Sequence, residues 1–108
     1  MDHSFAQVQE SMTSRDTMLK VLRDLKGRLA EQYGVKEIGI FGSVVRGEAS
    51  DQSDVDVLVE FSRPIGFFKF LELEEYLGGC LGRKVDLVSK KALKPRIGAH
   101  ILEEVVNA

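Results

Sequence analysis

The sequence has little of several features that mark other classes of protein. Its 108 residues include a single cysteine, Cys80, which excludes an internal disulfide framework and a cysteine-based zinc site. It has no long apolar run, and its N-terminus lacks the basic and apolar segments of an export signal. We therefore expect a cytoplasmic protein with no membrane-spanning segment.

An excess of positive charge is also missing. Fifteen Lys and Arg residues stand against 17 Asp and Glu residues, which gives a net charge of -2 at pH 7. No overall positive field attracts nucleic acid or an anionic membrane, so any polyanion has to be held by a local group of residues.

Length and composition predict one folded domain. Hydrophobic residues make up 44% of the chain and charged residues 30%, which is close to the average of soluble globular proteins. A chain of this length has room for one hydrophobic core and not for two. Residues 1–12 lack clear periodicity, so we expect a loose N-terminal arm there and the domain over residues 13–108.

Hydrophobic periodicity predicts the element order α-β-loop-β-α-β-α. The expected segments are helices over 14–33, 67–81 and from Pro95 to the C-terminus, strands over 35–41, 54–61 and 84–88, and a loop over 42–53 with a helical turn near Ser43. Thr13 and Asp16 stand in capping-box positions, and Gly34 should end the first helix. The Gly78-Gly79 pair should fray or end the second.

Aromatic and acidic residues on the helices have simple expected positions. Phe67 and Phe70 are expected in the core, whereas Phe68 is open between core and surface. Glu103 and Glu104 are expected on a solvated helix face, without a metal role.

The lengths of the connections predict how the strands pair. Eleven residues separate Gly42 from Asp54, which is marginal for a parallel crossover, whereas the helix before the third strand gives ample length for one. We therefore expect an α/β fold (α+β-like), with a small mixed sheet of at least three strands and helices packed on it.

Asp54 and Asp56 are the strongest candidates for chemistry. Two residues apart on a strand, their side chains emerge on one face with Cα atoms about 7 Å apart. Two carboxylates this close repel each other, and Mg2+ or Mn2+ is the natural counter-charge. Asp86 would be a third ligand and a general base if its strand lies beside theirs in suitable register. Two ions about 4 Å apart would then clamp the attacking and leaving oxygens of a phosphoryl displacement.

A second candidate group lies just upstream, in Gly42-Ser43 and Arg46. Glycine allows close backbone approach, and free N–H groups with the Ser43 hydroxyl favour phosphate. Arg46, one turn further, has two open interpretations: it adds positive charge for a triphosphate, or it only pairs with Glu48 or Asp51.

These residues together resemble the signature of the DNA polymerase β nucleotidyltransferase superfamily. An Asp-x-Asp pair alone is usually a solvated strand end, but here Gly-Ser, ten residues and then Asp-x-Asp stand in one stretch, FGSVVRGEASDQSDVDVLV. With Lys84-Val85-Asp86-Leu87-Val88 at the right distance and a small chain, the sequence is similar to the minimal nucleotidyltransferases, the MNT proteins.

The resemblance implies a fold, a reaction and a partner. It implies the nucleotidyltransferase fold, Gly42 and Ser43 on the β and γ phosphates of ATP, Asp54 and Asp56 on two Mg2+ ions, and Asp86 completing the metal site and activating the acceptor hydroxyl. It also implies transfer of AMP to a tyrosine of a HEPN-domain toxin, with this chain as the antitoxin.

Two alternatives to this function stay open. In the first, the chain is a binding module that neutralises its partner by occlusion. In the second, it is a free-standing nucleotidyltransferase acting on a small molecule or nucleic acid. The second is weaker because no basic tract is visible. A homo- or hetero-oligomer is possible in each case.

Overall fold

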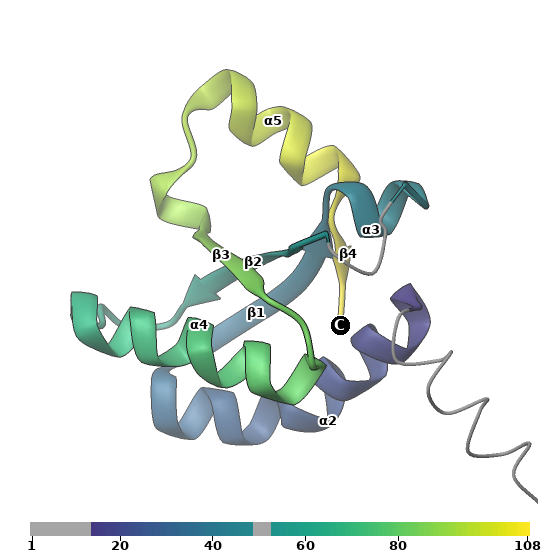
Figure 1. Ribbon diagram of the computed structural model, residues 1–108. Coiled ribbons are helices and arrows are strands. Elements are labelled where there is room, and N and C mark those ends of the chain that lie inside the picture. Colours follow the sequence, from purple (N-terminus) through teal and green to yellow (C-terminus); the bar gives the residue numbers. More distant parts are fainter. Residues whose placement is uncertain (1–13, 49–52) are drawn as a thin grey trace, which may run out of the picture.

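The computed structural model describes residues 14–48 and 53–108, and its elements follow the expected order with two additions, a 3-10 turn and a fourth strand (Figure 1). The expected arm, residues 1–12, lies outside the described residues. No helix in the described segments is long and apolar enough to cross a membrane. The elements are α2 (Arg15–Tyr33), β1 (Val35–Phe41), α3 (Ser43–Arg46), β2 (Val55–Phe61), α4 (Phe67–Leu81), β3 (Val85–Ser89), a 3-10 turn (Lys90–Ala92), α5 (Pro95–Glu104) and β4 (Val106–Asn107).

The strands form one mixed sheet in the order β3-β2-β1-β4. β1 is antiparallel to β2 and to β4, and β2 is parallel to β3. This confirms the mixed sheet: the short loop after β1 returns the chain antiparallel, whereas α4 is long enough to carry it back to a parallel start. Figure 1 shows α2 and α4 side by side on one face, with α5 on the other side of the sheet.

The core lies between this helix pair and the sheet. Val55, Val57 and Val59 are completely buried, as their alternation with the aspartates predicts. The helices supply long apolar side chains at helical spacing, namely Met18, Leu22, Leu29, Leu73, Leu77 and Leu81. At the outer edge of the sheet, the Leu87 N–H of β3 donates to Oε2 of Glu74 on α4 at 2.8 Å.

The first helix ends as expected but begins one residue later. Gly34 ends α2, and its N–H donates to the Ala30 carbonyl at 3.1 Å. The N-cap is Ser14 rather than Thr13: the Ser14 hydroxyl accepts the Thr17 N–H at 3.1 Å. The two neighbouring hydroxyl residues offer the same cap chemistry, so local sequence does not decide between them.

The expected break at Gly78-Gly79 is wrong, because α4 continues to Leu81. Leu77 and Leu81 are buried on either side of the pair. Their packing outweighs the cost of about 1 kcal/mol that each helical glycine carries.

Replacing Gly79 by Ala should therefore stabilise the protein. A Cβ at Gly79 meets nothing within 4 Å, so the free energy of unfolding should rise by about 0.5–1 kcal/mol, measured by urea unfolding. Gly78→Ala is the matched control, because its Cβ would lie 3.1 Å from the Arg83 carbonyl oxygen and the gain should be smaller. No gain from Gly79→Ala would contradict the continuous helix.

The aromatic residues at the start of α4 are more exposed than expected. Phe70 packs against the core, and its ring lies edge to face with that of Phe61, with 6.2 Å between the ring centroids. This confirms the prediction that Phe70 belongs to the core. Phe67 is wrongly predicted as core: its exposed fraction is 69%, and that of Phe68 is 82%. Phe67 extends the apolar stripe by spacing, but it is the first residue of α4 and stays largely exposed at the rim of a pocket.

The last helix does not continue to the C-terminus as expected. It ends at Glu104, and Val106–Asn107 forms the additional strand β4 beside Gly39 and Ile40. Branched valines favour an extended backbone, and the edge of β1 offers backbone hydrogen bonds. The expected apolar stripe stays partly in solvent, with Ile97 61% exposed.

Candidate active site

Two of the three predicted carboxylates lie side by side on neighbouring strands. In the parallel pair, Asp56 on β2 stands opposite Asp86 on β3. The next pair, Val57 and Leu87, is buried. Because side chains alternate between faces, Asp56 and Asp86 both project to the other face. Asp54 lies just before β2 and is exposed. The register on which the Asp86 prediction depended is therefore present.

Burial and like charge raise the pKa of Asp56. Burial is the larger cause, and the negative charges of Asp86 and Asp54 add to it, whereas Arg46 opposes them. Asp56 thus lies within electrostatic reach of two other carboxylates. An all-oxygen set of this kind suits Mg2+.

The side chains do not converge on an ion as they stand. Within residues 14–48 and 53–108, no three His, Cys, Asp or Glu residues are grouped closely enough to hold a metal. Adjacent strands are about 4.8 Å apart, so rotation of Asp56 and Asp86 about their side-chain bonds can bring their oxygens together. The residues present fit a divalent cation in chemistry and in backbone spacing.

Gly42 brings the predicted phosphate loop against Asp56. Phe41, the last residue of β1, pairs with Asp56, and the predicted helical turn α3 begins at Ser43. Gly42 has a φ of 78°, and a Cβ there would collide with Oδ2 of Asp56. Glycine is therefore required both for the backbone conformation and for the close approach of the carboxylate.

Arg46 is held by two carboxylates. Its Nε lies 2.9 Å from Oε1 of Glu48, which is one of its two expected pairings, and its Nη1 lies 2.6 Å from Oε1 of Glu104. These contacts raise the pKa of Arg46, with the bond to Glu48 as the larger cause. Asp51, the other predicted partner, lies outside the described residues.

Glu104 is the residue of this region that the sequence does not predict. Besides binding Arg46, it accepts the Gly42 N–H at 2.8 Å. The bonds from Arg46 and then from Gly42 lower the pKa of Glu104. Spacing alone puts Glu104 on a solvated helix face, which is wrong. Only the return of the chain as β4 brings it to the loop.

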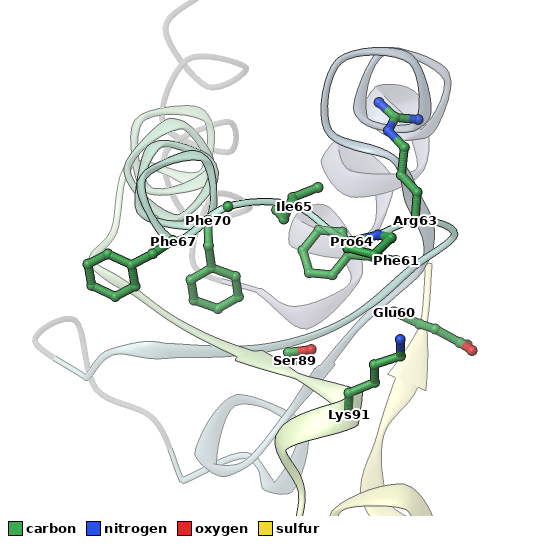
Figure 2. Close-up of a pocket in the computed structure, with 10 residues that line it drawn as sticks. Glu60, Phe61, Arg63, Pro64, Ile65, Phe67, Phe70, Ser89 and Lys91 are labelled. Carbon is green, nitrogen blue, oxygen red and sulfur yellow. The ribbon is translucent and has the colours of Figure 1, made fainter.

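The apolar pocket drawn in Figure 2 is a separate feature. It encloses about 360 Å³ and is lined by Phe61, Pro64, Ile65 and Phe70, with Glu60 and Lys91 at its polar side. These residues gather at the far end of β2, about 16 Å along the strand from Asp56. Asp54, Asp56 and Asp86 do not line this pocket. The pocket is therefore not the predicted site of chemistry.

Comparisons with known proteins identify the family of this chain. Residues 22–107 match the family model for the nucleotidyltransferase domain. The protein adenylyltransferase MntA of Thermococcus cleftensis is 49% identical over 96 residues, which cover 89% of this chain and 97% of that protein.

Solved structures share the fold. One described as a candidate minimal nucleotidyltransferase is 35% identical with a TM-score of 0.71, covering 86% of this chain and 94% of its own. A chain from the complex of tri-AMPylated Shewanella oneidensis HEPN toxin with MNT antitoxin has a TM-score of 0.57 at 20% identity, covering 92% of this chain and 69% of its own. The chain has the nucleotidyltransferase fold and belongs to the nucleotidyltransferase domain family.

Proposed function

We propose that this chain is a Mg2+-dependent nucleotidyltransferase that transfers AMP from ATP to a hydroxyl of a partner protein. The observation that carries the proposal is the pairing of Asp56 with Asp86, with Gly42 packed directly against Asp56. Burial and the nearby Asp86 and Asp54 raise the pKa of Asp56, so a cation would stabilise the three carboxylates in their charged form. A glycine loop beside them suits a phosphate chain.

Each predicted residue has a role in this reaction. Asp54, Asp56 and Asp86 hold Mg2+, which would stabilise the charge that develops on the α-phosphate and on the leaving pyrophosphate. Asp86 also takes the proton of the acceptor hydroxyl. Gly42 and Ser43 hold the β and γ phosphates, and Arg46 adds positive charge. The acceptor oxygen bonds to the α-phosphorus in line as the bond to pyrophosphate breaks.

The proposed acceptor is a tyrosine of a HEPN-domain toxin, with this chain as its antitoxin. Two similarities support it. The Thermococcus relative is named a protein adenylyltransferase, and the Shewanella complex that shares the fold pairs an MNT antitoxin with an AMPylated HEPN toxin.

A labelling experiment tests the reaction and the acceptor class together. The purified chain is incubated with Mg2+ and α-labelled ATP in lysate of its host, beside an Asp54→Asn/Asp56→Asn variant. We expect a labelled protein band with the wild-type chain only. γ-Labelled ATP is the matched control and should give no label through this chain, because that phosphate leaves in pyrophosphate. Label on RNA or on a small molecule would contradict the protein acceptor.

Occlusion without catalysis is the second candidate, and the exposed aromatic pair on α4 favours it. Phe67 and Phe68 meet edge to face at 5.7 Å and are largely exposed, as is typical of a protein contact surface. If occlusion is the mechanism, the aspartate variant still suppresses the partner, whereas Phe67→Ser/Phe68→Ser does not. The reverse result favours catalysis.

A further inference from the structure

Glu104 connects the end of α5 to both ends of the short helix α3. One carboxylate oxygen accepts the N–H of Gly42 at 2.8 Å, before α3 begins, and the other binds Nη1 of Arg46, the last residue of α3, at 2.6 Å. The Glu104 side chain is only 14% exposed. Both oxygens are thus engaged by groups of the predicted phosphate loop.

Strand pairing brings Glu104 to this position. In the antiparallel pair, Asn107 stands opposite Gly39 and Val106 opposite Ile40. Continued by two residues, the same register places Glu104 opposite Gly42. The N–H of Ala108 donates to the Ile38 carbonyl at 2.9 Å, which extends the pairing on the other side.

Gly39 makes the close approach of β4 possible. A Cβ at Gly39 would lie 2.7 Å from the Val106 carbonyl oxygen, closer than side chains tolerate. The position of Glu104 therefore depends on a glycine that does not touch the loop.

A carboxylate bound to both ends of α3 restricts the loop in two ways. It fixes the direction of the Gly42 N–H, and together with Glu48 it limits the rotation of the Arg46 guanidinium. A loop that is ordered before the ligand arrives loses less conformational entropy on binding.

We propose that Glu104 is a positioning residue, which holds the Gly42-Ser43 loop and Arg46 in the conformation that binds the triphosphate of the nucleotide. The inference rests on the proposed function, because it takes this loop as the phosphate site. The opposite possibility is that the Glu104 carboxylate occupies the phosphate position and competes with the nucleotide, and the experiment separates the two.

The test compares Glu104→Ala with Glu103→Ala, the neighbouring exposed glutamate of equal charge. We expect Glu104→Ala to raise both the Kd for Mg-ATP and the KM for ATP about tenfold, with kcat changed less than twofold. Glu103→Ala should leave all three unchanged. Glu104→Gln keeps one acceptor oxygen and the side-chain size, so its Kd should lie between those of wild type and Glu104→Ala.

Gly39→Ala provides an independent variant. By displacing β4 it should raise the Kd in the same direction as Glu104→Ala, although the loop sequence is intact. Amide hydrogen exchange without nucleotide provides a readout apart from activity: the Gly42 N–H should exchange about tenfold faster in Glu104→Ala and unchanged in Glu103→Ala.

Each outcome decides something. A lower Kd in Glu104→Ala would overturn the proposal and show competition by the carboxylate, and an unchanged Kd would overturn it as well. If the wild-type chain binds Mg-ATP but transfers no AMP, the proposed function fails, while the Kd values still test Glu104. If the wild type does not bind Mg-ATP, both the function and the role in nucleotide binding fail, and hydrogen exchange then reports only on loop order.

Discussion

Changing Asp54 and Asp56 together to Asn should lower AMP transfer by about a thousandfold or more and leave the fold intact. A divalent cation contributes several kcal/mol of charge stabilisation in the transition state, and about 4 kcal/mol corresponds to a factor of a thousand in rate. Asn is nearly isosteric with Asp but is a poor ligand for Mg2+. Initial rates with α-labelled ATP measure the loss. Asp24→Asn, at an exposed position of α2, is the control and should keep the wild-type rate.

The same variant should be more stable than the wild type at neutral pH without Mg2+. Burial and the neighbouring carboxylates raise the pKa of Asp56 in the folded state, so folding favours its protonated form. The folded state of the wild type is therefore relatively favoured below the ordinary aspartate pKa and loses this advantage as the pH rises through the raised value. We expect the stability advantage of the Asn variant over the wild type, measured by urea unfolding, to shrink between pH 7 and pH 4.

Retained AMP transfer in the double variant would refute the catalytic role of Asp54 and Asp56.

Gly42→Ala should lower AMP transfer by about a hundredfold and destabilise the fold. With a φ of 78° and a ψ of -149°, Gly42 has a backbone conformation that is essentially restricted to glycine and costs an alanine about 1–3 kcal/mol. Its Cβ would also collide with Oδ2 of Asp56, so the carboxylate or the loop has to move away from the position required for catalysis.

Gly47→Ala separates these two effects. Gly47 ends α3 with a φ of 74°, but a Cβ there meets nothing within 4 Å. Both variants carry the cost of a positive φ, but only Gly42→Ala adds the collision with Asp56. Gly47→Ala should therefore lose less stability in urea unfolding, and only Gly42→Ala should lose most of its transfer rate. Equal loss of transfer in the two variants would show that backbone strain, not the collision with Asp56, is responsible.

Strands β1, β2 and β3, and the face of β2 that carries Asp56, were predictable because they depend on local patterns. The alternation of valine with aspartate identifies both the buried face of β2 and the face that carries Asp56. The short loop after β1 makes a parallel return marginal, which favours the mixed sheet. The placement of Asp86 needed one further fact, the register of β3, which a single sequence does not contain.

The features that were not predictable depend on contacts between distant parts of the chain. Continuation of α4 through Gly78-Gly79 depends on burial of Leu77 and Leu81 beneath the sheet. The bonds from Glu104 to the loop join residues 62 positions apart and exist only because β4 pairs with β1. Spacing within a helix cannot reveal such a contact, since the same pattern fits a glutamate in solvent.

The contact between Glu74 and β3 limits how copies of this chain, or its partners, can associate. An edge strand with free N–H groups is a template on which another chain adds a strand. Here the Leu87 N–H is already bound by a carboxylate from α4. An incoming strand would have to displace that side chain and bring its own backbone against a negative charge. Assembly by continuing the sheet past β3 is thus disfavoured, so on this side of the sheet side chains rather than backbone groups would select a partner.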